Sequence, residues 1–134
     1  MAIVTASLNI SSRDIMNSAL SLSDSATLTT AGTLTGVASV FGLNSLTLTS
    51  ASKVDLITYA DENISGAGAK LYIKNTQVIG EGTNYVTVFI NSQQLGRLYG
   101  GQFMFIPYTG GSGEDIEVQP SNTDSVTLEY LVTF

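Results

Sequence analysis

The chain has 134 residues, a net charge of −6, no cysteine and no histidine, and only 12% of its residues are charged. This length suits one domain with a substantial hydrophobic core. The acidic balance disfavours nucleic acid and anionic membranes as partners, and the absence of cysteine excludes disulfides and thiolate metal sites.

The N-terminus lacks the positively charged region of a secretory signal, and no apolar run approaches the length that spans a bilayer. We therefore expect a soluble protein made in the cytoplasm. Ser and Thr contribute sixteen residues each, so the surface is expected to be rich in hydroxyl groups. Because these groups cost less to bury than Lys or Glu, the composition favours a protein whose surface is partly covered by other subunits.

Residues 2–10 carry no strong turn signal and are predicted to form an extended terminal arm. Ser12 has the chemistry of a helix N-cap, which favours at most one helical turn over residues 12–20. Alternation of apolar and polar residues resumes at Leu20.

Residues 25–52 carry no charge, and Leu alternates there with Thr in 26–30, 32–36 and 46–49. A period of two is typical of strands. Such a segment lacks the charges that normally keep exposed strand edges from associating. Two interpretations stay open: a half-buried sheet in an ordinary monomer, or a surface that another subunit covers.

The second half of the chain holds a series of short strands separated by turn signals. The amphipathic strand 69–75 is the clearest, because Leu71 and Ile73 point one way and Lys70, Tyr72 and Lys74 the other. The other predicted strands are 53–59, 85–90, 95–99, 102–106, 115–119 and 125–134.

The segment 85–107 is predicted to be a β-meander. Asn91-Ser92 supplies one tight turn, and Gly100-Gly101 supplies a pair suited to a two-residue hairpin loop. With seven to nine strands and almost no helix, the chain is predicted to be all-β, an antiparallel β-sandwich or jelly-roll-like single domain. We expect residues 1–20 to form the arm and residues 21–134 the sandwich.

The sequence offers little chemistry. Without His or Cys, an enzyme would depend mainly on acid pairs such as Asp61 with Glu62, or on the cluster Glu114, Asp115 and Glu117. Loop acids also suit calcium, but neither group has the ligand spacing of an EF-hand. We predict a protein that is not an enzyme and uses no metal or cofactor.

Tyr72, Tyr85, Tyr99 and Tyr108 could line a sugar-stacking face, although strand aromatics more often lie in a core or at a subunit contact. Arg97 is either a solvated strand charge or one half of a charged pair across a subunit boundary. The candidate residues for an interface with another protein subunit are Ile3, Val4, Leu8, Ile10, Leu28, Leu34, Val37, Phe41, Arg97 and Tyr99.

A series of segments carries a resemblance to a known group of proteins. The series begins with Ala69 to Thr76, Tyr85 to Val88 and Leu95 to Pro107, and a Gly-rich loop and the closing strand 125–134 follow. In this order the segments resemble small tailed-phage virion proteins. The resemblance covers roughly residues 55–134, and its motifs are structural rather than catalytic.

The resemblance implies a structural virion protein, a capsid decoration or cement protein that binds across capsomers on the head surface. It implies the major capsid protein or other virion proteins as partners, and a homo-oligomer, with a trimer favoured. Two alternatives stay open: a tail or fibre component of the virion, or a carbohydrate-binding β-sandwich module.

Overall fold

The chain is described by a computed structural model, which covers residues 3–13, 20–28, 40–58, 69–78, 84–108 and 113–133 and gives only the backbone of 40–42. These residues form ten strands, and all strand pairs are antiparallel. No described segment is a helix that is long and apolar enough to cross a membrane.

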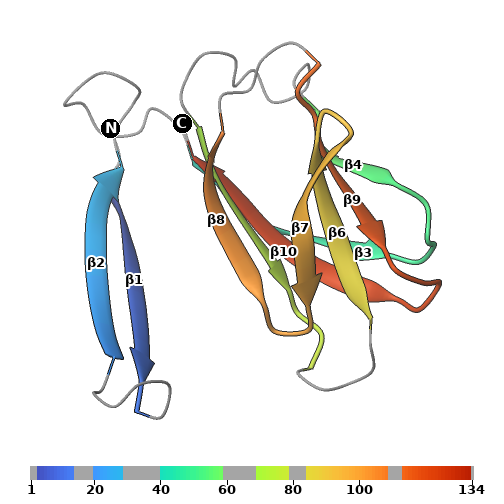
Figure 1. Ribbon diagram of the computed structural model, residues 1–134. Helices are drawn as coiled ribbons and strands as arrows, with labels where there is room; N and C mark the ends of the chain where they lie inside the picture. Colours follow the sequence, from blue (N-terminus) through green and yellow to red (C-terminus); the bar gives the residue numbers. More distant parts are fainter. Residues whose placement is uncertain are drawn as a thin grey trace.

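Eight strands form a sandwich of two four-stranded sheets (Figure 1). The first sheet has the order β3 (Val40–Leu48), β10 (Val126–Thr133), β5 (Ala69–Asn75) and β8 (Phe103–Tyr108). The second has the order β4 (Val54–Ile57), β9 (Ile116–Pro120), β6 (Tyr85–Ile90) and β7 (Gln93–Tyr99). This order is that of a jelly roll, so the predicted all-β antiparallel sandwich is confirmed.

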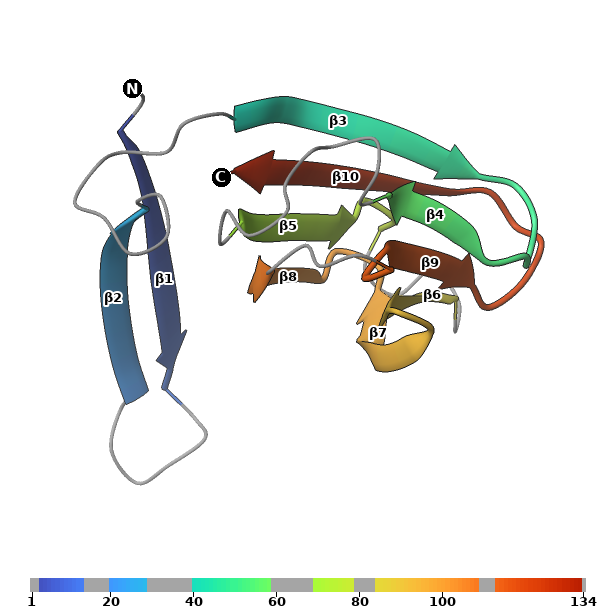
Figure 2. The ribbon, with the colours of Figure 1, turned by 90° about the horizontal axis from the view of Figure 1, so that it is seen from above.

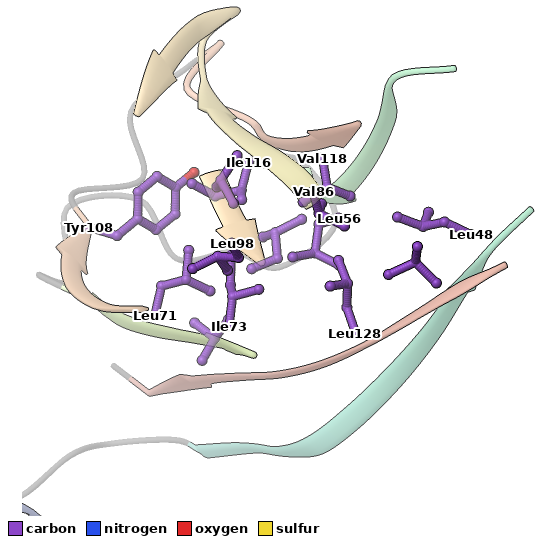
Figure 3. Close-up of a cluster of buried hydrophobic side chains, with 14 of the residues drawn as sticks. Leu48, Leu56, Leu71, Ile73, Val86, Leu98, Tyr108, Ile116, Val118 and Leu128 are labelled. Atoms are coloured by element: carbon purple, nitrogen blue, oxygen red, sulfur yellow. The ribbon is translucent and has the colours of Figure 1, made fainter. Parts of the chain in front are cut away.

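The core lies between the two sheets, where side chains from both inner faces meet (Figure 3). In β5 every second residue is buried, so Leu71 and Ile73 point inward and Tyr72 points outward, as predicted. Val86 and Val88 of β6 fill the opposite side, and each of these four aliphatic residues is 0% exposed. Because complete burial of such a side chain contributes about 1.5–3 kcal/mol, this layer accounts for much of the stability.

The two tight turns of the segment 85–107 have different outcomes. Asn91 and Ser92 have φ angles of 46° and 60° and close a two-residue hairpin between β6 and β7, which confirms the first turn. The predicted meander is wrong beyond that point. Strand β8 pairs with β5 in the first sheet, so Gly100 and Gly101 form a corner between the sheets instead of a hairpin loop.

The N-terminal residues form a separate two-stranded sheet, in which β1 (Val4–Ser12) pairs with β2 (Leu20–Leu28). Figure 2 shows this hairpin beside the sandwich, with its strands running across the direction of β3 and β10. The expected extended arm is therefore a paired strand, and Ser12 is its last residue instead of an N-cap.

The rest of the predicted helical turn, residues 14–19, lies outside the described residues, as do the strand predicted at 32–36 and the acid pair Asp61 with Glu62. The two paired strands lie between Val4 and Leu28. The predicted division of the chain into an arm of residues 1–20 and a sandwich of residues 21–134 stays a prediction. The expected seven to nine strands are fewer than the ten observed, because the arm was not expected to pair.

Candidate interaction surface

The β1–β2 hairpin has two chemically different faces, which follow from its register. Side chains of directly paired residues lie on the same face of a sheet, and that face alternates along each strand. One face, called here the apolar face, carries the pairs Val4–Leu28, Ala6–Ala26, Leu8–Asp24, Ile10–Leu22 and Ser12–Leu20. The other, called the hydroxyl face, carries Thr5–Thr27, Ser7–Ser25, Asn9–Ser23 and Ser11–Ser21.

Burial along the apolar face changes from one end of the hairpin to the other. Leu28 is only 7% exposed, although it lies outside the core cluster of the sandwich. Toward the far end Leu8, Ile10 and Leu22 are 44%, 45% and 47% exposed. A row of large aliphatic side chains in water is typical of a surface that binds another molecule.

A second apolar surface lies on the outer face of the first sheet. It consists of Tyr72, Phe103, Phe105 and Leu131, and we call it the aromatic strip. Tyr72 pairs with Phe105 on one side and with Leu131 on the other, and its ring centroid lies 6.1 Å from that of Phe103. Phe103 and Phe105 are 57% and 41% exposed, so the strip is largely open to solvent.

The hairpin and the aromatic strip face each other across an open groove of about 530 Å³. The groove is lined by the strip and by only part of the hairpin, residues 4–8, 24–26 and Leu28. Ile10, Leu20 and Leu22 do not line it. The hairpin therefore faces its own sandwich with one half of its length and extends past the groove with the other.

Charges of opposite sign lie on the two surfaces. Asp24, opposite Leu8, is the one charged residue on the apolar face. Lys70 and Lys74 stand on either side of Tyr72 on the outer face of β5. A carboxylate within an apolar surface is tolerated at an interface when a cation meets it.

The structure separates the predicted interface residues into groups. Val4, Leu8, Ile10 and Leu28 gather on the apolar face, and Ile3 precedes it at 83% exposure. Phe41 belongs to β3, where its backbone pairs with Val132. Leu34 and Val37 lie outside the described residues.

Arg97 and Tyr99 lie elsewhere, on the outer face of the second sheet. The guanidinium of Arg97 stacks over the Tyr85 ring at 4.5 Å, and the Tyr99 ring centroid is 5.4 Å from that of Tyr85. Tyr72 is on the opposite sheet and Tyr108 is buried at 3% exposure. The four tyrosines considered for sugar stacking therefore do not share one face.

The acidic residues of the segment 113–117 have structural contacts. The Glu117 carboxylate lies 3.5 Å from the Lys53 ammonium and accepts a hydrogen bond of 2.9 Å from the Ser92 amide. The Tyr108 hydroxyl donates to the Glu114 carbonyl, and burial, followed by the charges of Asp115 and Glu114, raises the pKa of Tyr108 to about 12. Among the described residues, no three acidic side chains gather to hold a metal ion.

Sequence reasoning missed the aromatic strip. The sequence does contain a signal for it, because all four residues of Phe103-Met104-Phe105-Ile106 are apolar, so both faces of this strand are apolar. Met104 and Ile106 pack against the core, so Phe103 and Phe105 must point away from it. A fully apolar strand in a sheet with no third layer implies an outer apolar surface.

No family model and no curated protein sequence matches this chain. Among solved structures, the chain is similar to the cupin domain of Cnp3 from Schizosaccharomyces pombe, with a TM-score of 0.44 and 9% identity. That match covers 94% of this chain and 82% of the other. A likeness this distant carries no argument about function.

Proposed function

We propose that this chain is a structural virion protein that decorates a phage head as a homotrimer and stabilises the head without catalysis. The observation that carries the proposal is the β1–β2 hairpin, which stands beside the jelly roll with Ile10 and Leu22 on an exposed apolar face. The resemblance of the segments 70–76 and 95–107 to small phage virion proteins supports the same class.

The mechanism is the addition of buried area. A ligand that binds only the assembled state of a particle stabilises that state by mass action. Lasting association needs an interface of about 1,200–2,000 Å², which no single hydrophobic side chain supplies. A two-faced hairpin meets this need, because its apolar face packs on protein while its hydroxyl face stays in water.

The test is to add purified protein to phage heads that lack it. We expect the protein to remain attached through sedimentation and to raise the melting temperature of the heads. A variant with Ile10→Lys and Leu22→Lys should lose attachment, because each change places a charge on the apolar face with which the hairpin packs on protein in the assembled head. The matched control, Ser11→Lys with Ser23→Lys, changes the hydroxyl face of the same hairpin and should remain attached.

Two results would contradict the proposal. Failure of the wild-type protein to bind any head would exclude a decoration role. Binding to tail-only particles instead of heads would assign the chain to the tail or fibre.

A further inference from the structure

We propose that the apolar face of the hairpin packs on the aromatic strip of a second copy of this chain, so that neighbouring copies are joined by their arms. The inference deepens the proposed function by naming the contact that would build the homotrimer. The two surfaces involved are Ile10, Leu20 and Leu22 on the arm, and Tyr72, Phe103 and Phe105 on the strip.

The first argument is that the described part of one chain leaves both surfaces incompletely covered. Only the half of the hairpin near Val4 and Leu28 lines the groove of its own sandwich. The half that holds Leu20 and Leu22 extends past it, with exposures of 36% and 47%. Phe103, at 57% exposure, is still more open.

The second argument is complementary chemistry. Both surfaces are predominantly aliphatic or aromatic, and each carries charge of the sign that the other lacks. Asp24 lies within the apolar face, whereas Lys70 and Lys74 border Tyr72 on the receiving sheet. Such a pair fixes the register of two sheets that pack face to face.

This charge pairing also sets which side chains meet. If Asp24 lies over Lys74 and β2 runs across β5 in the direction of β8, then Leu22, two residues along the same face of β2, lies over Phe103, the cross-strand partner of Lys74. The pair Leu22 and Phe103 is therefore the contact to test.

The third argument is area. Each strand of the hairpin has nine residues, so the hairpin is about 30 Å long and about 10 Å wide, and one face covers about 300 Å². A hairpin that packs through this face also covers an equal area of the receiving sheet, so one contact buries about 600 Å² when both surfaces are counted. In a closed trimer each copy takes part in two such contacts, one through its own arm and one through its strip, so its association with the other two copies buries at most about 1,200 Å², the lower end of the range of stable interfaces.

The chain contains no cysteine, so single cysteines can be introduced for cross-linking without a background. We would mix a Leu22→Cys variant with a differently tagged Phe103→Cys variant and oxidise the mixture mildly. Each variant has a single cysteine, so a disulfide that joins two differently tagged chains must connect two copies of the protein. The matched control replaces Leu22→Cys by Ser23→Cys, which puts the thiol one residue away on the hydroxyl face.

We expect the Leu22→Cys mixture to form the mixed disulfide at least about tenfold faster than the Ser23→Cys mixture, because alternate residues of a strand face opposite sides. Equal rates would overturn the proposal. Sedimentation of the unmodified protein without heads gives the second measurement. A closed oligomer is expected, and Leu22→Lys should weaken its association at least about tenfold while Ser23→Lys changes it little.

A monomeric wild-type protein, or an oligomer that Leu22→Lys leaves intact, would overturn the arm contact. Neither measurement uses a phage head, so the two proposals fail separately. A monomer that still binds heads would remove the arm contact and keep the decoration role. An oligomer that binds no head would do the reverse.

Discussion

The side-chain amide of Asn75 donates a 3.0 Å hydrogen bond to the backbone carbonyl of Leu98, and this bond joins the two sheets of the sandwich. Asn75 ends β5 in the first sheet, and Leu98 lies in β7 of the second. The side-chain oxygen of Asn75 accepts a further bond of 3.0 Å from the amide of Gln77. Asn75 is completely buried, so no solvent competes for these contacts.

Replacing Asn75 should therefore destabilise the fold strongly. Asn75→Ala leaves the Leu98 carbonyl and the Gln77 amide without these partners, and the expected loss is about 2–4 kcal/mol in the free energy of unfolding. Urea denaturation followed by circular dichroism measures it. The control is Asn44→Ala at an exposed position of β3, where we expect less than about 0.5 kcal/mol. Similar losses for both variants would contradict the role of Asn75.

This bond gives Asn75 a structural role at the end of β5. Thr76 holds the end of β5 to its neighbour β10 in the same sheet, because its hydroxyl donates to the Thr127 carbonyl at 2.7 Å. The contact of Asn75 with the other sheet depends on how segments far apart in the sequence pack together. A local sequence pattern therefore does not predict it.

Local patterns predicted the strands well where one face is apolar and the other polar. Strand 69–75 agrees residue for residue with β5, and strand 85–90 agrees with β6. The corner at Gly100 was misread, because glycine suits a hairpin loop and a close crossing of backbones equally well. Phe103 and Phe105 were missed as surface residues, since aromatic residues in an apolar strand read as buried.

Gly100 and Gly96 form a matched pair for a second prediction. A β-carbon on Gly100 would lie 2.6 Å from the backbone carbonyl oxygen of Val78, whereas one on Gly96 would meet nothing within 4 Å. Gly100→Ala should therefore cost about 1–3 kcal/mol, because backbone must move to relieve the overlap. Gly96→Ala should be neutral or stabilise by up to about 1 kcal/mol, because Gly weakens the interior of a strand. Thermal unfolding of the two variants distinguishes them, and equal melting temperatures would contradict the close approach.

Tyr108 should make stability depend on alkaline pH. Burial, followed by the charges of Asp115 and Glu114, raises the pKa of this phenol to about 12, whereas in the unfolded chain it is about 10. The folded protein thus holds the proton over a range in which the unfolded chain releases it. The contribution is fully present below pH 10 and is lost as the pH rises toward 12, by up to about 2–3 kcal/mol.

The measurement is the free energy of unfolding of the wild type and of Tyr108→Phe between pH 8 and about pH 12. Tyr108→Phe removes the hydrogen bond to the Glu114 carbonyl, so it should be less stable at neutral pH. Its stability should then fall less steeply above pH 10, because one titrating group is gone. Parallel curves for the two proteins would show that Tyr108 titrates as an ordinary tyrosine.

Hydrogen exchange should separate the hairpin from the sandwich. A two-stranded sheet is marginally stable in water, and among the strands that the structure describes β1 pairs with β2 alone, whereas β10 lies between β3 and β5. In the Leu22→Lys variant, which should stay monomeric, amides of β1 and β2 should exchange at least about a hundredfold faster than those of β10, a difference of about 2.7 kcal/mol in local opening. In assembled wild-type protein and in the Ser23→Lys control, the hairpin amides should become protected while those of β10 change little. If the amides of β1 and β2 were as well protected as those of β10 in the monomer, the hairpin would be stabilised by its own sandwich. That result would contradict the proposal that the hairpin needs the aromatic strip of a second copy.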